Sequence, residues 1–176
     1  EDNAVIVRLD PGLAFGTGTH PTTALCLEWL DGLDVAGKTV LDYGCGSGVL
    51  AIAALKLGAR AATGMDIDPQ AVTATLQNAE RNAVAEKMTV LGSDKAIDDT
   101  FDIVVANILA GPLIELAESV ITRLSSGGDL ALSGILSGQV DKIQAAYAPW
   151  ILFDEPAFRT QGKQTWARLN GKRRND

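Results

Sequence analysis

The sequence predicts an α/β fold in which a mostly parallel sheet carries helices on both faces. Apolar runs rich in β-forming residues alternate with stretches of helical period, an order typical of βαβ units. The central runs are apolar throughout, as expected of strands buried on both faces. The predicted strands are residues 4–7, 39–41, 61–65, 88–91, 101–105 and 129–132. Two more strand-like runs, 150–153 and 164–169, have no helix between them and predict an antiparallel pair at the C-terminal edge, followed by a solvated basic end at 172–174.

Four segments are predicted as helices. One begins at Pro69 with Asp68 as its N-cap, because proline suits the first helical position and aspartate accepts from the free N–H groups there. Its apolar face is predicted at Val72, Leu76, Ala79 and Ala83. Another helix is predicted to end at Gly127. Its apolar stripe consists of Leu113, Ala117, Val120, Ile121 and Leu124. The remaining two cover 22–30 and 48–57.

The composition favours a single globular domain over residues 1–176. The apolar fraction is 47% and the charged fraction is 21%, which is too apolar for a disordered chain. Two cysteines and one histidine are too few for a disulfide framework or a His-rich metal centre, so we expect no metal. No apolar run could span a bilayer and no secretory signal is visible, so we expect a cytoplasmic location and no membrane contact. The net charge of −7 argues against direct binding to nucleic acid.

The strongest motif is a glycine-rich turn between a predicted strand and a predicted helix. It reads Asp42-Tyr43-Gly44-Cys45-Gly46-Ser47-Gly48. Glycines let the backbone turn sharply and let a ligand approach, and the N–H groups at the start of the next helix favour an anion. A dinucleotide-binding turn of the form G-x-G-x-x-G would need glycine at the position of Val49. The residues that complete a Walker A loop do not follow either, and a purely structural turn is the remaining alternative.

Polar residues follow other predicted strands. Asp66 ends the second strand, 22 residues after Gly44, where an acid accepts hydrogen bonds from both ribose hydroxyls. Asn107 ends the strand that begins at Phe101, at the carboxyl edge where open α/β sheets bind ligands, and its amide could accept from an amine. Asp94, after the third strand, is a weaker candidate for the edge of an adenine ring. Taken alone, Asp66 could be an ordinary surface acid and Asn107 a turn former.

Residues 10–23 are rich in glycine and threonine and precede a predicted helix. This composition predicts a mobile loop followed by a hydroxyl-rich helix start. His20, the only histidine, lies in this segment directly before a proline. A lone histidine in such a place is usually structural, and a catalytic base is the alternative.

At this point the residues resemble known families. The glycine turn at 42–48 together with Asp66 looks like the class I S-adenosylmethionine-dependent methyltransferases. Segment 10–23 and the run 107–113, which reads NILAGPL, resemble the narrower PrmA family. Members of that family methylate ribosomal protein eleven of the large subunit. The resemblance covers roughly residues 5–169.

The resemblance implies a Rossmann-like, seven-stranded class I methyltransferase sheet that binds S-adenosylmethionine. It implies methylation of lysine side chains and of the N-terminal amine of the ribosomal protein, which is the expected partner. It also implies a separate upstream domain that recognises this protein. Residue 1 is Glu rather than Met, and we expect this chain to be the catalytic domain without the upstream one. Within it, residues 1–20 are expected to supply a strand and a loop over the cofactor.

The resemblance also carries over individual site residues. With Asp94 added from the strand pattern, the expected cofactor-binding residues are Phe15, Gly16, Thr23, Gly44, Gly46, Asp66, Asp94 and Asn107. The two glycines of the turn would line the methionine and ribose parts of the cofactor, and Thr23 would contact the methionine part. Phe15 and Gly16 would form a flexible wall over the site. Asn107 is the expected catalytic residue: it would accept a hydrogen bond from the substrate amine and aim its lone pair, while water takes the proton.

Other functions fit parts of the same pattern. The enzyme could methylate a small-molecule amine or a glutamine amide of another protein. Enzymes of the second kind favour an Asn-Pro-Pro-aromatic loop, whereas this chain has Asn107-Ile108-Leu109-Ala110. A cofactor-binding module without chemistry of its own is the alternative from a different class.

Overall fold

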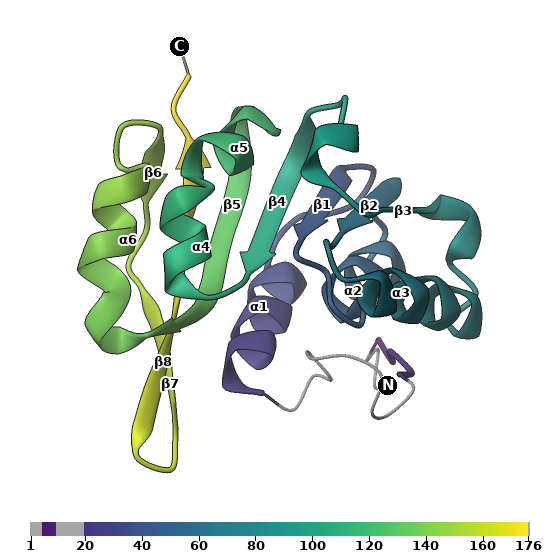
Figure 1. Ribbon diagram of the computed structural model, residues 1–176, viewed down its shortest axis with the longest axis horizontal. Coiled ribbons are helices and arrows are strands. Elements are labelled where there is room, and N and C mark those ends of the chain that lie inside the picture. Colours follow the sequence, from purple (N-terminus) through teal and green to yellow (C-terminus); the bar gives the residue numbers. More distant parts are fainter. Residues whose placement is uncertain (1–4, 10–19, 176) are drawn as a thin grey trace.

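A mixed sheet of eight strands runs through the molecule in the computed structural model, which describes residues 5–9 and 20–175 (Figure 1). The strands are β1 (Thr39–Tyr43), β2 (Ala61–Met65), β3 (Met88–Leu91), β4 (Phe101–Asn107), β5 (Leu124–Leu136), β6 (Ile151–Phe153), β7 (Ala157–Gln161) and β8 (Gln164–Arg173). Seven of them lie side by side in the order β3-β2-β1-β4-β5-β8-β6. The first five of this row are parallel, and β8 pairs antiparallel with β5, β6 and β7. The seven-stranded, mostly parallel sheet is therefore confirmed, and β7 is an additional strand.

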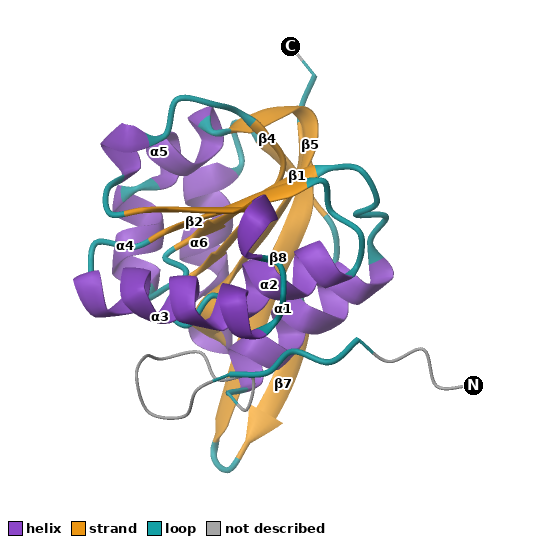
Figure 2. Cartoon of the chain, turned by 90° about the vertical axis from the view of Figure 1, so that its right-hand side faces the viewer, coloured by secondary structure: helices purple, strands orange, loops and turns teal. Residues whose placement is uncertain are grey.

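Helices cover both faces of the sheet (Figure 2). They are α1 (Pro21–Gly32), α2 (Val49–Lys56), α3 (Pro69–Arg81), α4 (Ala110–Glu115), α5 (Ala117–Thr122) and α6 (Val140–Tyr147), with three short 3-10 turns at Ala85–Lys87, Asp94–Ala96 and Ser137–Gln139. None of the helices in the described ranges has the length and apolar character needed to cross a membrane.

Two apolar clusters, one on each face, hold the helices to the sheet. Along β4 the side chains alternate: Ile103 and Val105 pack with residues of α1, α2 and α3, and Val104 and Ala106 pack with residues of α4, α5 and α6. Successive side chains of a strand point to opposite faces, so a strand covered on both sides must be apolar at every position. This explains why the central runs of the sequence are continuously apolar.

The buried face of α3 differs from the prediction. Asp68 caps the helix as expected, accepting from the N–H of Gln70 at 2.9 Å, but Leu76 is 48% exposed. Of the predicted face, Ala79 is buried, Val72 is half-buried, and Ala83 is exposed beyond the end of the helix. The other buried residues are Ala71, Ala74, Thr75 and Asn78. This face packs against the glycine turn, where a Cβ at Gly48 would lie 2.7 Å from Thr75 Cγ2, so only small side chains fit between them.

The stripe from Leu113 to Leu124 is buried as predicted, but it does not belong to one helix. Helix α4 gives way to α5 at Leu116, α5 ends at Thr122, and Leu124 already starts β5. Gly127 and Gly128 therefore lie inside a strand and do not end a helix. A Cβ at Gly128 would lie 2.9 Å from the carbonyl oxygen of Asp102, so glycine here allows β4 and β5 to approach each other.

Both ends of the described chain depart from expectation. Residues 5–9 form no strand. The side-chain amide of Asn82 holds this segment by two hydrogen bonds: it accepts from the N–H of Arg8 at 2.8 Å and donates to the carbonyl of Arg8 at 2.7 Å. The basic end is exposed at Lys172 and Arg174, as predicted, but Lys172 and Arg173 belong to β8 and are held there. Lys172 Nζ lies 2.8 Å from Asp129 Oδ1, and Arg173 donates to the carbonyl of Ile121 at 3.0 Å.

Candidate active site

The carboxyl ends of β1, β2 and β4 meet at one edge of the sheet, the lower edge in Figure 1. Tyr43, the last residue of β1, is paired with Met65 of β2 and with Ala106 of β4. The next residue of each chain segment is therefore brought to the same place: Gly44, Asp66 and Asn107. Three residues predicted from separate motifs meet here because Gly44 and Asp66 directly follow β1 and β2 and Asn107 is the last residue of β4.

The glycine turn is folded tightly between β4 and α3. Gly44, Gly46 and Gly48 have φ values of 80°, 55° and 84°, in the left-handed region that favours glycine. A Cβ at Gly44 would overlap Cγ2 of Ile108, the residue after Asn107. The turn therefore needs glycine both for its backbone conformation and for its close contact with the segment that carries Asn107.

Asp66 connects the end of β2 to this turn. Its Oδ2 accepts from the N–H of Gly46 at 3.0 Å, and its Oδ1 accepts from the N–H of Asp68 at 3.0 Å. A carboxylate offers about four lone-pair positions, so two remain for further donors. The side chain is partly exposed at the edge of the sheet. It can thus accept hydrogen bonds from a ligand's hydroxyl groups while it holds the turn.

Asn107 and Thr23, 84 residues apart in the sequence, contact each other. Asn107 Nδ2 donates to Thr23 Oγ1 at 3.4 Å, and Thr23 is buried in the first turn of α1. Within the described ranges no group donates to Asn107 Oδ1, and the residue is partly exposed. With the amide nitrogen on Thr23, the side-chain oxygen is the atom of Asn107 that can accept from a substrate.

His20 has a structural place at the start of α1. Its Nδ1 accepts from the N–H of Thr22 at 3.2 Å and lies 2.8 Å from Thr22 Oγ1, so it is the N-cap of the helix. Its ring meets the indole of Trp166 in β8 edge to face, with 4.8 Å between centroids. The structural alternative for His20 is therefore the one that the geometry supports.

Asp94 belongs to a polar network that the sequence did not predict. Its Oδ2 accepts from the Tyr43 hydroxyl at 3.0 Å and from Ser119 Oγ at 3.1 Å, and Arg123 donates to its backbone carbonyl at 3.0 Å. The hydrogen bond from Tyr43 lowers the pKa of the Asp94 carboxyl. The network ties the end of β1 to the turn after β3 and to α5. Tyr43, which had no assigned role, holds the Asp94 side chain in place.

Asp42 lies beneath the glycine turn. It is buried in β1, and its Oδ2 accepts from the N–H of Ala51, in the first turn of α2, at 3.2 Å. The helix has a glycine at its N-cap, so Asp42 supplies the acceptor that a capping side chain would provide. Burial raises the pKa of Asp42 to about 7. No lysine or arginine in the described part of the chain forms an ion pair with Asp42 or Asp66.

Three further residues that shape the edge were missed by sequence reasoning. Thr75 Oγ1 donates to the carbonyl of Gly46 at 3.0 Å, and Asn78 Nδ2 donates to that of Ser47 at 2.9 Å. Gly134 in β5 has a φ of 87°, and a Cβ there would overlap the carbonyl oxygen of Ile108. Two polar residues three apart on an alanine-rich helix face are a signal that could have pointed to the first pair. Phe15 and Gly16, the expected wall over the site, lie outside the described residues.

A family model described as ribosomal protein L11 methyltransferase (PrmA) matches residues 1–174. The chain belongs to the PrmA family. A relative from Shewanella sp. (strain W3-18-1), named ribosomal protein L11 methyltransferase, is 57% identical over 175 residues, which is 99% of this chain. A relative of the same name from Actinobacillus pleuropneumoniae serotype 5b (strain L20) is 59% identical over 172 residues. This PrmA-family chain spans 58% and 57% of the lengths of these two relatives.

A solved structure has the same fold. The crystal structure of a ribosomal protein L11 methylase from Lactobacillus delbrueckii subsp. bulgaricus matches with a TM-score of 0.85 and 36% identity, covering 97% of this chain and 86% of that one. The PrmA-family chain therefore has the class I methyltransferase fold expected from its motifs.

Proposed function

We propose that this chain forms the catalytic part of an S-adenosylmethionine-dependent enzyme that methylates amines of ribosomal protein L11. The observation that carries the proposal is the meeting of Gly44, Asp66, Asn107 and Thr23 at one edge of the sheet, in a chain of the PrmA family. Such an enzyme works where ribosomal proteins are made and assembled, so the proposal includes a cytoplasmic location.

The residues at the glycine turn fit S-adenosylmethionine better than a dinucleotide. Asp66 lies beside the turn, without an ion-pair partner from lysine or arginine in the described ranges. Its carboxylate attracts a ligand with a sulfonium and an ammonium group, and its lone pairs can accept from ribose hydroxyls. The residues present therefore fit S-adenosylmethionine, and Val49 already breaks the dinucleotide pattern.

In the proposal, different residues of the site contact the ribose, the methionine part and the adenine of S-adenosylmethionine. Asp66 accepts from the ribose hydroxyls with its two remaining lone-pair positions, while the glycine turn lies along the ribose and methionine parts. Thr23 lies on the methionine side, and Asp94, held by Tyr43, lies on the adenine side beyond β3. When bound, S-adenosylmethionine supplies an electrophilic methyl group that an amine takes up as the thioether leaves.

Placement of a neutral amine is the main task of the protein. At pH 7 a free lysine amine is protonated, and its neutral form costs about 4.6 kcal/mol, compared with about 1 kcal/mol for an N-terminal amine. Asn107 Oδ1 accepts one N–H of the neutral amine and so directs its lone pair toward the methyl group. An amide is not a base, so the proton that the amine loses goes to water.

Two measurements test the proposal. Calorimetry on this chain should detect binding of S-adenosylmethionine and of its demethylated product, and no binding of NAD. The full-length protein that contains this chain should transfer labelled methyl groups to purified L11, at lysine and N-terminal amines located by mass spectrometry. Binding of NAD in place of the sulfonium compound, or an unmodified L11, would overturn the assignment.

A further inference from the structure

The first turn of α1 is held from two sides at the edge of the sheet. On one side Thr23 accepts from Asn107 of β4 at 3.4 Å. On the other side Trp166 of β8 packs edge to face against His20, the N-cap of the helix. His20 and Thr23 are three residues apart, within one helical turn. A displacement of the N-cap residue His20 is therefore expected to displace Thr23, the residue that accepts from Asn107.

Trp166 acts at a distance from Asn107 along the sheet. Asn107 is paired with Ser133 of β5, whereas Trp166 is paired with Leu136 of the same strand. Trp166 thus lies three residues further toward the carboxyl edge, about 10 Å at the usual rise of a strand. The contact with His20 connects Trp166 to Asn107 through α1.

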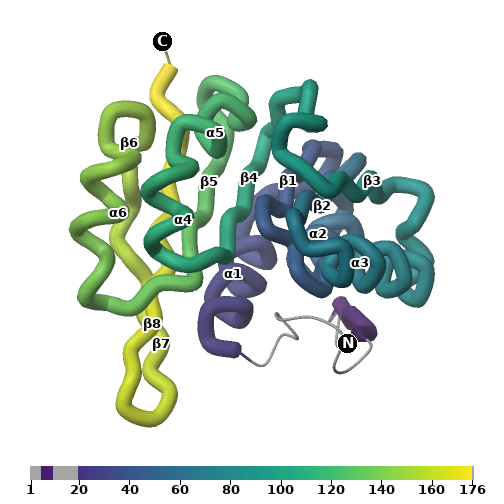
Figure 3. Tube along the Cα trace, in the orientation of Figure 1, coloured from purple at the N-terminus to yellow at the C-terminus, as the bar shows by residue number. Residues whose placement is uncertain are grey.

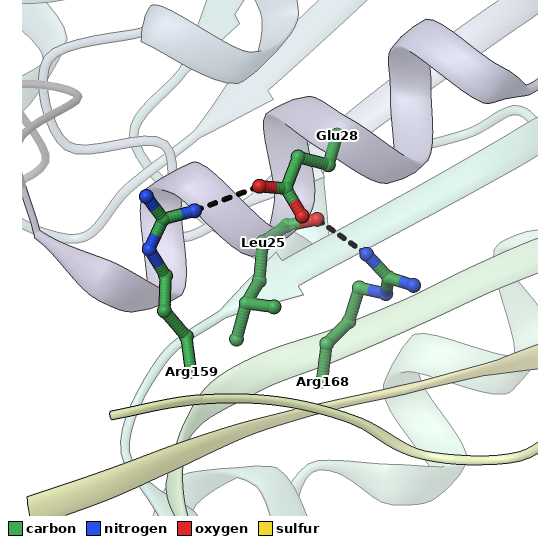
Figure 4. A network of polar contacts seen from close by, with 4 residues as sticks. All are labelled: Leu25, Glu28, Arg159 and Arg168. Carbon is green, nitrogen blue, oxygen red and sulfur yellow. Dashed lines mark hydrogen bonds and ion pairs between the residues drawn. The ribbon is translucent and has the colours of Figure 1, made fainter.

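The β7–β8 hairpin contacts α1 at two more points. Arg168 donates to the carbonyl of Leu25 at 2.6 Å, and Arg159 forms an ion pair with Glu28 at 2.7 Å (Figure 4). The hairpin extends beyond the lower edge of the sheet, next to the start of α1 (Figure 3). Among these described contacts between the hairpin and α1, the ring contact of Trp166 reaches the N-cap residue His20, whereas the two arginine contacts reach later residues of the helix.

We propose that Trp166 is a positioning residue, which fixes the first turn of α1 through His20 and thereby keeps the Asn107 amide turned so that Oδ1 faces the substrate amine. The proposal rests on the function proposed above. An amide whose nitrogen loses its acceptor can rotate by half a turn and present N–H groups to the amine, which cannot direct its lone pair. A small misplacement of such a group is enough to slow a reaction strongly.

The test compares single variants of the full-length protein that contains this chain. Trp166→Leu removes the ring contact, and His20→Asn removes it while keeping a good N-cap residue. Both should lower kcat about tenfold or more, with an unchanged KM for L11 and an unchanged pH profile. Trp166→Phe keeps an aromatic edge against His20 and should retain most of the wild-type kcat.

Arg159→Gln is the matched control. It breaks an exposed contact between the same hairpin and the same helix, away from the cap, and should leave kcat unchanged. An unchanged kcat in Trp166→Leu and His20→Asn, an effect confined to KM, or an equal loss in Arg159→Gln would overturn the positioning role. A changed pH profile in His20→Asn alone would also overturn it, since the ring would then act as a base. A wild-type protein that transfers no methyl group would refute the proposed function instead.

Discussion

Asn107 is the residue on which the proposed chemistry depends most directly. Replacing it by alanine removes the acceptor for the amine and the partner of Thr23 while leaving the glycine turn and Asp66 in place. We expect Asn107→Ala to lower kcat roughly 100-fold, because correct orientation of the amine is lost. Radiolabel transfer to L11 measures the effect. Since no proton passes to Asn107, the pH profile of the remaining activity should keep its shape, and full turnover in this variant would contradict the role.

Asp42 gives a pH dependence to the stability of the fold. Burial raises its pKa to about 7, whereas the pKa of an unfolded aspartate is about 3.9. The folded state therefore holds the proton more tightly, and the free energy of unfolding falls as the pH rises from about 4 to 7, by at most about 4 kcal/mol. Asp42→Asn keeps an acceptor for Ala51 but cannot ionise, so its stability should decline less over this window. Urea unfolding between pH 4 and 8 measures the slope.

The control for this experiment is Asp31→Asn, which alters an exposed acid at the end of α1. It should retain the wild-type slope, because an exposed side chain is not desolvated on folding. An Asp42→Asn variant whose slope equals that of the wild type would show that Asp42 is ionised in the folded protein throughout the window.

Among the elements, β5 fixes the segment that carries Asn107. The register of β5 against β8 shifts between Leu132 and Ile135, and Gly134 within this irregularity lets the backbone of Ile108 lie against the strand. Gly134→Ala combines a strained φ with overlap on that backbone. We expect it to lower the free energy of unfolding by about 2–3 kcal/mol. Activity at a temperature where the variant is still folded should fall as well, because Asn107 is displaced.

Gly138→Ala provides the comparison. Gly138 lies four residues further on in the next turn, and a Cβ there meets no atom within 4 Å. Its effect on the free energy of unfolding should stay within about 0.5 kcal/mol, with normal activity. Thermal unfolding and methyl transfer of the two variants, measured side by side, decide the point: equal losses in both would mean that the contact with Ile108 does not matter.

The sequence pattern locates strands whose side chains are buried on both faces of the sheet. β1 and β4 could be located because their runs are apolar on both faces, and the ends of three parallel strands brought Gly44, Asp66 and Asn107 to one edge. β7 could not be located, since most of its residues are exposed and carry no apolar alternation. α6 was missed although it buries Val140, Ile143 and Tyr147 at helical spacing.

The parts of the site that were not predicted depend on contacts between distant segments. Thr75 acts through the glycine turn, Gly134 through Ile108 and Trp166 through His20. In the sequence each of these residues stands among neighbours that give no sign of its partner. The predicted buried face of α3 is right at Ala79 and wrong at Leu76 for the same reason: helical period favoured Leu76, but the adjacent turn accepts only small side chains.

The molecule as a whole should be stabilised by its cofactor. The proposed ligand binds residues from β1, β2 and α1 together, and so it binds the folded state alone. A ligand of this kind adds RT ln(1 + [L]/Kd) to the stability, about 2.7 kcal/mol at a concentration of 100 Kd. For a domain of this size the gain corresponds to a rise in Tm of roughly 5–10 °C, which differential scanning fluorimetry can measure.

The same experiment separates the cofactor from its competitors through Asp66. The neutral demethylated product and S-adenosylmethionine should both raise Tm, and NAD should leave it unchanged because Val49 occupies the position where a dinucleotide-binding turn needs its third glycine. Asp66→Asn keeps an acceptor for the N–H of Gly46 but offers the ribose fewer lone pairs, so the shift at equal ligand concentration should shrink while the Tm of the free protein changes little. A shift that is as large in Asp66→Asn as in the wild type would place the ribose elsewhere, and with it the whole orientation of the cofactor along the edge of the sheet.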